Sequence, residues 1–334
     1  MTDSKADLKT DSKLDLSNPI LFDRSDWGHI RLTGADRVRF LHNQTTQDIQ
    51  QLSASQGAHT VFVTSTGRTI DLTTVYVEED SLLVVTSPDM AQQLYDWMDR
   101  YIFFSDKVTL TNESEQTFMF TLLGDRSDDI ASKLGASALV DAPPFSHQKI
   151  SVADVDVSVA VGSDLAIAGY TLWGNLAHAQ AIWQALISAG ATAGTAAQWN
   201  GLRIRQGRPM PKKELTEDDN PLEAGLWHSV SFEKGCYIGQ ETIARLNTYK
   251  GVKKRLWGLA LQEPVDIGAT VWLDENKIGK VTSLTDDESN PLALAYLRTK
   301  AGGEGLSVTV DNVAAQVVSL PFVTHSYPSG PSSA

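Results

Sequence analysis

The sequence predicts an α+β protein that ends in a small β-barrel. Helical and strand patterns are mixed before residue 250, without the regular strand–helix alternation of a doubly wound sheet. After residue 255 only strand patterns remain, as short apolar runs separated by polar or glycine-containing turns. Six such runs at this spacing are typical of a small barrel.

Two helices are predicted by apolar residues that recur every three or four positions. The first begins at Ser87-Pro88, and its apolar face consists of Met90, Leu94, Trp97 and Tyr101. The second begins at Asn175 and is stopped by Gly190, and its apolar face consists of Ala179, Ile182, Trp183 and Leu186. Both faces are expected to pack against a core.

Strands are predicted in both parts of the chain. In the first part they are expected at residues 60–64, 70–77, 82–86, 118–123 and 155–161. The barrel strands are expected at residues 256–261, 269–273, 277–284, 292–297, 306–310 and 314–318. The predicted organisation is a disordered tail (1–16), a two-subdomain α+β region (17–249), the barrel (250–325) and a second disordered tail (326–334).

The composition sets limits on function. The chain has 334 residues and 42% hydrophobic content, enough for two or three domains. No stretch approaches the roughly 20 apolar residues of a membrane helix, and the first 16 residues lack the apolar centre of a signal peptide, so the cytoplasm is the expected location. A single cysteine excludes an intramolecular disulfide framework and a metal site built only from this chain's thiolates.

The net charge of -13 disfavours a protein that grips nucleic acid along its backbone, so direct RNA binding is not expected. The exception is a basic stretch that comprises Lys234, Arg245, Lys250, Lys253, Lys254 and Arg255. This stretch is either a solvated turn before a strand or a site for an anion, such as ligand carboxylates or a short RNA segment.

Cys236 lies in the octapeptide KGCYIGQE, residues 234–241. Glycines on both sides let the backbone bend sharply, and the turn amides and Lys234 favour a thiolate over a thiol. Cys236 is therefore a candidate nucleophile or ligand. The alternative is an inert cysteine in a tight turn.

The octapeptide, followed by Arg245, resembles the K-G-C-Y-x-G-Q-E signature of the folate-binding YgfZ proteins, relatives of the aminomethyltransferase of the glycine cleavage system. Other matching segments occur in the family's order at residues 32–36, 40–48, 67–68, 199–204 and 221–226. The resemblance covers roughly residues 18 to 320. It implies an aminomethyltransferase-like folate-binding fold, with interleaved α+β domains around a central channel and a C-terminal β-barrel.

The resemblance also implies a cofactor, tetrahydrofolate or a related reduced folate. A flat pterin needs an aromatic wall, hydrogen-bond partners for its edge and donors for the glutamate carboxylates. The implied aromatic partners are Trp27 and Trp199. The alternative for each is a tryptophan that only packs in the core. Glu223, Gln240 and Arg245 are the remaining predicted binding residues.

Two departures separate the sequence from the transferase. The transferase has an acidic pair in its G-x-x-I-D-D-L segment, whereas here Asp71 is followed by Leu72. After Gly169-Tyr170-Thr171 the chain has Leu172-Trp173 in place of Gly-Glu, so the carboxylate for the pterin edge is missing. An accessory protein is therefore favoured over the alternative, a tetrahydrofolate-dependent aminomethyltransferase. Asp71 is a candidate proton acceptor or, otherwise, a turn residue.

The YgfZ resemblance implies a role in maintaining iron–sulfur enzymes, among them the tRNA methylthiotransferase. One thiolate supplies only one of the four protein ligands of a typical cluster, so any contact with a cluster must be transient or shared with a partner. Cys236 is the expected working residue, with Lys234 and Arg245 keeping it anionic. Whether a reaction is catalysed stays open at this point.

Overall fold

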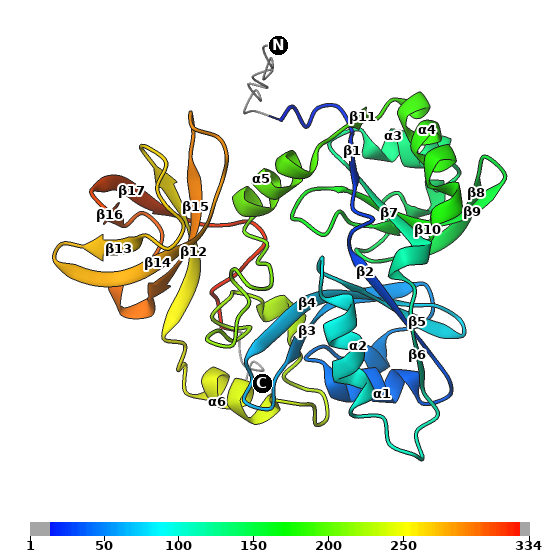
Figure 1. Ribbon diagram of the computed structural model, residues 1–334, viewed down its shortest axis with the longest axis horizontal. Coiled ribbons are helices and arrows are strands. Elements are labelled where there is room, and N and C mark those ends of the chain that lie inside the picture. Colours follow the sequence, from blue (N-terminus) through cyan, green and yellow to red (C-terminus); the bar gives the residue numbers. More distant parts are fainter. Residues whose placement is uncertain (1–13, 328–334) are drawn as a thin grey trace, which may run out of the picture.

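The computed structural model describes residues 14–327 as three lobes, each built around its own β-structure (Figure 1). They are a five-stranded sheet, a six-stranded sheet and a closed barrel. The predicted disordered tails lie outside the described residues, except for residues 14–16 and 326–327.

The five-stranded sheet has the order β3-β4-β5-β2-β6. Its strands are β2 (Gly28–Thr33), β3 (Gln56–Val63), β4 (Thr69–Val77), β5 (Ser81–Thr86) and β6 (Thr109–Asn112). Apolar residues of α1 (Arg37–Gln44) and α2 (Ala91–Asp99) form one core with this sheet. Leu94 of α2 is fully buried in that core, which confirms the predicted helix and its apolar face.

The six-stranded sheet has the order β11-β1-β7-β10-β9-β8. Its strands are β1 (Ile20–Asp23), β7 (Thr117–Leu123), β8 (His147–Val152), β9 (Val155–Val161), β10 (Gly169–Asn175) and β11 (Thr192–Ala193), and its helices are α3 (Ser127–Lys133) and α4 (Ala179–Ala189). The Asn175 side chain accepts a hydrogen bond from the Ala177 N–H (2.9 Å), and Gly190 ends α4 with a φ of 117°, as predicted.

The chain interleaves the two sheets. It enters the six-stranded sheet with β1, crosses to build the whole five-stranded sheet, and returns at β7. Residues of both sheets then share a core that contains Tyr76 and Leu83 from one sheet and Met119 and Trp173 from the other. This confirms the interleaved α+β domains.

The barrel closes in the order β12-β15-β14-β13-β16-β17, which confirms six C-terminal strands. They are β12 (Lys254–Leu261), β13 (Thr270–Leu273), β14 (Asn276–Leu284), β15 (Leu292–Arg298), β16 (Ser307–Val310) and β17 (Val313–Val318). The helices α5 (Ala196–Gln206) and α6 (Gln240–Thr248) lie in the connection to the barrel (Figure 1). Among residues 14–327, no helix is both long enough and apolar enough to cross a bilayer.

Short 3-10 helices complete the chain. They are η1 (Ile49–Gln51), η2 (Ser114–Gln116), η3 (Ser137–Leu139), η4 (Leu176–His178), η5 (Trp227–Ser229) and η6 (Thr299–Ala301). The segment from η5 to α6 contains the cysteine.

Candidate functional site

The loop that carries Cys236 is fastened to the segment at the end of α1. The backbone N–H of Ser231 donates to the carbonyl oxygen of Thr46 at 2.9 Å, and that of Ile238 donates to the carbonyl oxygen of Asn43 at 3.1 Å. These bonds hold the loop on both sides of the cysteine. The Cys236 side chain itself is exposed to solvent.

Lys234 is buried beneath this loop, and it does not face the thiol as a free cation. Its ammonium donates to the carbonyl oxygens of Thr45 at 2.8 Å and Gln47 at 2.7 Å, and also to that of His42. These three bonds use all three N–H donors of the ammonium. Burial lowers the pKa of Lys234 to about 7, although the negative charge of Asp48 opposes this shift. The structure thus corrects the expected role of Lys234: it ties the loop to α1.

Gln240 and Arg245 belong to the same unit as the cysteine. The Gln240 amide donates to the carbonyl oxygen of Gly235 at 3.3 Å, and Arg245 is exposed on α6, the helix that Gln240 begins. Gly239 has a φ of 80°, and a Cβ there would lie 2.4 Å from the carbonyl oxygen of Thr64. A glycine is therefore required where the loop packs on the turn between β3 and β4.

Asp71 is fully buried on β4. Its carboxylate accepts hydrogen bonds from the Ser87 N–H at 2.9 Å and from the Ser87 hydroxyl at 2.7 Å. Burial raises the pKa of Asp71 to about 7, although the bonds from Ser87 and the charge of Arg208 oppose this shift. The Asp71 carboxyl group therefore gains or loses its proton near neutral pH.

The two predicted pterin-stacking residues do come together, but around a side chain of the protein itself. The guanidinium carbon of Arg24 lies 3.7 Å from the ring centroid of Trp27 and 4.4 Å from that of Trp199. The guanidinium carbon of Arg208 lies 4.6 Å from the Trp27 ring. Trp27 is only 3% exposed, so its ring is part of a buried cation–π cluster.

Asp164 holds this cluster together. Its carboxylate accepts a hydrogen bond from Arg24 at 2.7 Å, is ion-paired with Arg208 at 2.9 Å and lies 2.7 Å from Nε2 of His59. Burial raises the pKa of Asp164, but Arg208 and Arg24 outweigh it and hold that pKa well below its usual range. The resulting buried charge network occupies the space between the two predicted pterin partners.

Trp173 takes up the position that the resemblance assigns to the pterin-binding carboxylate. It is 4% exposed and stacks on Tyr76, with ring centroids 4.5 Å apart. A pterin at this place needs an open aromatic face and an acceptor for its edge, whereas Trp27 lies under guanidinium groups and Trp173 offers no carboxylate. The residues present do not fit a pterin there.

Glu223 is not brought to the tryptophans to replace the missing carboxylate. It accepts a hydrogen bond from the Asn220 N–H at 3.3 Å, and its own carbonyl accepts one from Leu256 of the barrel at 3.0 Å. Burial raises the pKa of Glu223, and the nearby Lys254 opposes that shift. Glu223 therefore belongs to the junction with the barrel.

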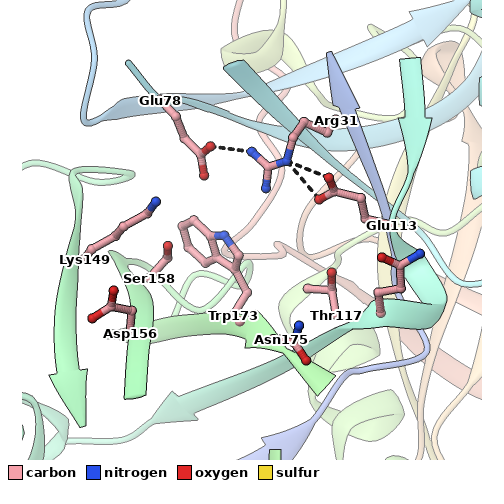
Figure 2. A pocket seen from close by; sticks show the side chains of 11 residues that line it. Arg31, Glu78, Glu113, Thr117, Lys149, Asp156, Ser158, Trp173 and Asn175 are labelled. Carbon is pink, nitrogen blue, oxygen red and sulfur yellow. Dashed lines mark hydrogen bonds and ion pairs between the residues drawn. The ribbon is translucent and has the colours of Figure 1, made fainter. Parts of the chain in front are cut away.

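Two sizeable cavities lie among the described residues. None of the eight predicted site residues lines either of them, but Trp173 lines the first. The first, about 310 Å³, lies between the two sheets (Figure 2). There Arg31 points between Glu78 and Glu113, and its Nε lies 2.9 Å from both carboxylate oxygens of Glu113. The second cavity, about 580 Å³, lies against the barrel and is lined by several lysines.

Sequence reasoning missed the residues that organise the interior. Arg24, Asp164 and Arg208 lie in three loops far apart in the chain, and no local pattern connects them. The one signal in the sequence is that each of these three charged residues lies beside an apolar segment, which suggests that it is buried. The lysines of the second cavity were missed for the same reason, except Lys254.

Two family models match the chain. The GCVT N-terminal domain matches residues 15–234, and the glycine cleavage T-protein C-terminal barrel domain matches residues 254–324. A protein of Arabidopsis thaliana, whose name describes it as a candidate chloroplastic transferase, is 41% identical over 92% of this chain and 72% of its own length.

More distant relatives share the same arrangement. The aminomethyltransferase of Halalkalibacterium halodurans is 29% identical over 90% of this chain and 86% of its own. The crystal structure of the glycine cleavage system aminomethyltransferase T from Bartonella henselae superposes with a TM-score of 0.81 at 21% identity, covering 93% of this chain and 88% of that one. With both family models matched in order, this chain belongs to the glycine cleavage T-protein family.

Proposed function

We propose that this chain is a cytoplasmic accessory protein of the T-protein fold that supports the assembly or repair of iron–sulfur enzymes, including the tRNA methylthiotransferase. The observation that carries the proposal is the exposed Cys236 thiol on a loop that buried hydrogen bonds hold in place. The YgfZ-like octapeptide and the missing pterin carboxylate also support it.

The way in which the chain can contact a cluster follows from its number of thiols. Cys236 offers a single thiolate, whereas a typical cluster takes four protein ligands, so a partner enzyme supplies the others. The chain's own contribution is to hold one sulfur at a fixed place on the surface. Lys234 and Gln240 position the loop, and Arg245 adds positive charge on the adjoining helix. The cluster is the cargo, not a resident group.

A reduced folate is the ligand that family membership supports, and when bound it would supply one-carbon units. Because the side chains around Trp27 do not form an open pterin site, no step of the proposal depends on folate. Tetrahydrofolate titration followed by tryptophan fluorescence tests this ligand separately. If folate quenches the tryptophan fluorescence of the wild type and this quenching is lost in Trp199→Ala, folate binding beside Arg24 is supported. If folate leaves the wild-type fluorescence unchanged, this binding is contradicted.

The experiment for the thiol compares two variants in cells that depend on this protein. Cys236→Ala is expected to abolish support of tRNA methylthiolation, whereas Glu233→Gln, an exposed change in the same loop, is expected to retain it. Full methylthiolation with Cys236→Ala at normal protein abundance would refute the proposal. The aminomethyltransferase alternative instead requires formation of methylenetetrahydrofolate from an aminomethyl donor, which the purified protein is expected not to catalyse.

A further inference from the structure

The cavity of about 580 Å³ lies between the barrel and the segment that precedes η5. Its cationic lining side chains outnumber its two acidic ones, Asp218 and Asp219. The cations are Lys212, Lys213, Lys254, Lys277, Lys280 and Arg298. In a chain with a net charge of -13, this is a local reversal of sign. It concentrates positive potential in a concave site.

Most of this positive charge is not neutralised. Lys254 forms an ion pair with Asp219 at 2.7 Å, but the other five cations have no carboxylate within ion-pair distance among residues 14–327. Lys254 on β12 also lies directly opposite Arg298 on β15 in the strand register. Like charges directly opposite each other destabilise a sheet, and here Asp219 compensates Lys254 but not Arg298.

Lys213 lies on the loop side of the cavity, in the segment that precedes η5. Burial lowers the pKa of Lys213, and the charge of Arg203 outside the cavity adds to this shift, whereas Glu214 and Asp286 oppose it. An anion in the cavity would reverse this effect by favouring the charged amine. The cations therefore form a group that gains from a shared counter-ion.

The floor of the cavity is apolar. Tyr296, Ile278 and Val281 are buried barrel residues that line it. The Tyr296 hydroxyl donates to the carbonyl oxygen of Glu214 at 2.7 Å, and the Lys254 ammonium lies 4.9 Å from the centroid of the Tyr296 ring. An apolar floor surrounded by ammonium groups suits a molecule with an organic body and several negative charges.

We propose that this cavity binds a small organic polyanion, a molecule of cofactor size that carries two or more phosphate or carboxylate groups. Its volume lies within the range of about 300–1,000 Å³ of small-molecule sites. A nucleic acid strand fits less well, because the one aromatic residue in the lining, Tyr296, is 8% exposed and gives no stacking platform. This inference is independent of the Cys236 proposal.

Calorimetric titration of the full chain with three probes tests the site: adenosine triphosphate, tri-γ-glutamate and inorganic tripolyphosphate. The first two represent phosphate and carboxylate sources of the same chemistry. We expect at least one of them to bind more tightly than tripolyphosphate, because only they can cover the apolar floor. Tighter binding of tripolyphosphate than of both would overturn the requirement for an organic body.

Two double variants with equal charge changes locate the binding. Lys277→Gln/Lys280→Gln removes two cations of the cavity, and Lys253→Gln/Lys300→Gln removes two exposed lysines that do not line it. The first is expected to weaken binding about ten-fold and the second by less than about two-fold. Equal losses, no binding by any probe at millimolar concentration, or tighter binding of single-stranded RNA than of the probes would overturn the proposal. Cys236→Ala is expected to bind the probes unchanged.

Discussion

Trp173 stacks on Tyr76 across the junction of the two sheets, with ring centroids 4.5 Å apart and ring planes inclined by 23°. Both rings are nearly inaccessible to solvent. In the transferases that this sequence resembles, a glutamate follows the G-Y-T-G segment at this position. An indole in its place turns a polar ligand contact into packing between the two sheets, which supports the proposal that Cys236 is the working residue.

Replacing Trp173 tests this packing role. Trp173→Ala is expected to lower the free energy of unfolding by about 3–5 kcal/mol, because a large buried ring is removed and a cavity remains. Trp173→Phe keeps an aromatic plate against Tyr76 and is expected to cost clearly less. Urea denaturation of both variants measures the difference, and equal losses would show that the stack itself contributes little.

Lys234 is expected to be a stability residue despite its place in the cysteine octapeptide. Lys234→Met leaves three carbonyl oxygens near the end of α1 without their donor, so the unfolding free energy is expected to fall by about 2–4 kcal/mol. Lys250→Met, an exposed change nearby, is expected to shift it by less than about 0.5 kcal/mol. An undiminished stability in Lys234→Met would contradict this reading of the loop.

Asp71 is expected to make stability depend on pH. Its folded-state pKa of about 7 lies above the ordinary aspartate value of 3.8, so the folded protein holds this proton more tightly than the unfolded chain. Stability from this group is complete below the unfolded pKa and is lost as pH rises toward 7. Relative to Asp71→Asn, the wild type is expected to lose about 2–4 kcal/mol of unfolding free energy between pH 4 and 7.

Denaturation of both proteins across this pH range provides the measurement. The difference between wild type and Asp71→Asn removes the contributions of other titrating groups. A difference that does not change with pH would mean that Asp71 titrates alike in the folded and unfolded chains.

The sequence allowed much of the fold to be predicted, because its signals are local. The barrel strands are separated by turns, and the helical segment made of η4 and α4 begins at the Asn175 cap of η4 and ends at Gly190. Other elements carried weak signals. The strand β1 has four residues, and β11 has two, so neither shows a period that a pattern could detect.

The site could be predicted only in part, for a related reason. The octapeptide identified Cys236, but Lys234 finds its carbonyl partners 187 to 192 positions earlier in the chain. Likewise, Trp27 and Trp199 are brought to the same place only by Arg24, which lies against both rings and is held by Asp164, 140 residues away. Such long-range pairs depend on tertiary packing, which periodicity and motif spacing do not encode.

The proposed function requires that the folded protein presents one accessible thiol. Titration of the native chain with a colorimetric disulfide reagent tests it most directly, because Cys236 is the only cysteine. We expect one thiol to be released per chain in the native state, as fast as from a small reference thiol to within about ten-fold. A thiol that reacts only after denaturant is added would contradict it.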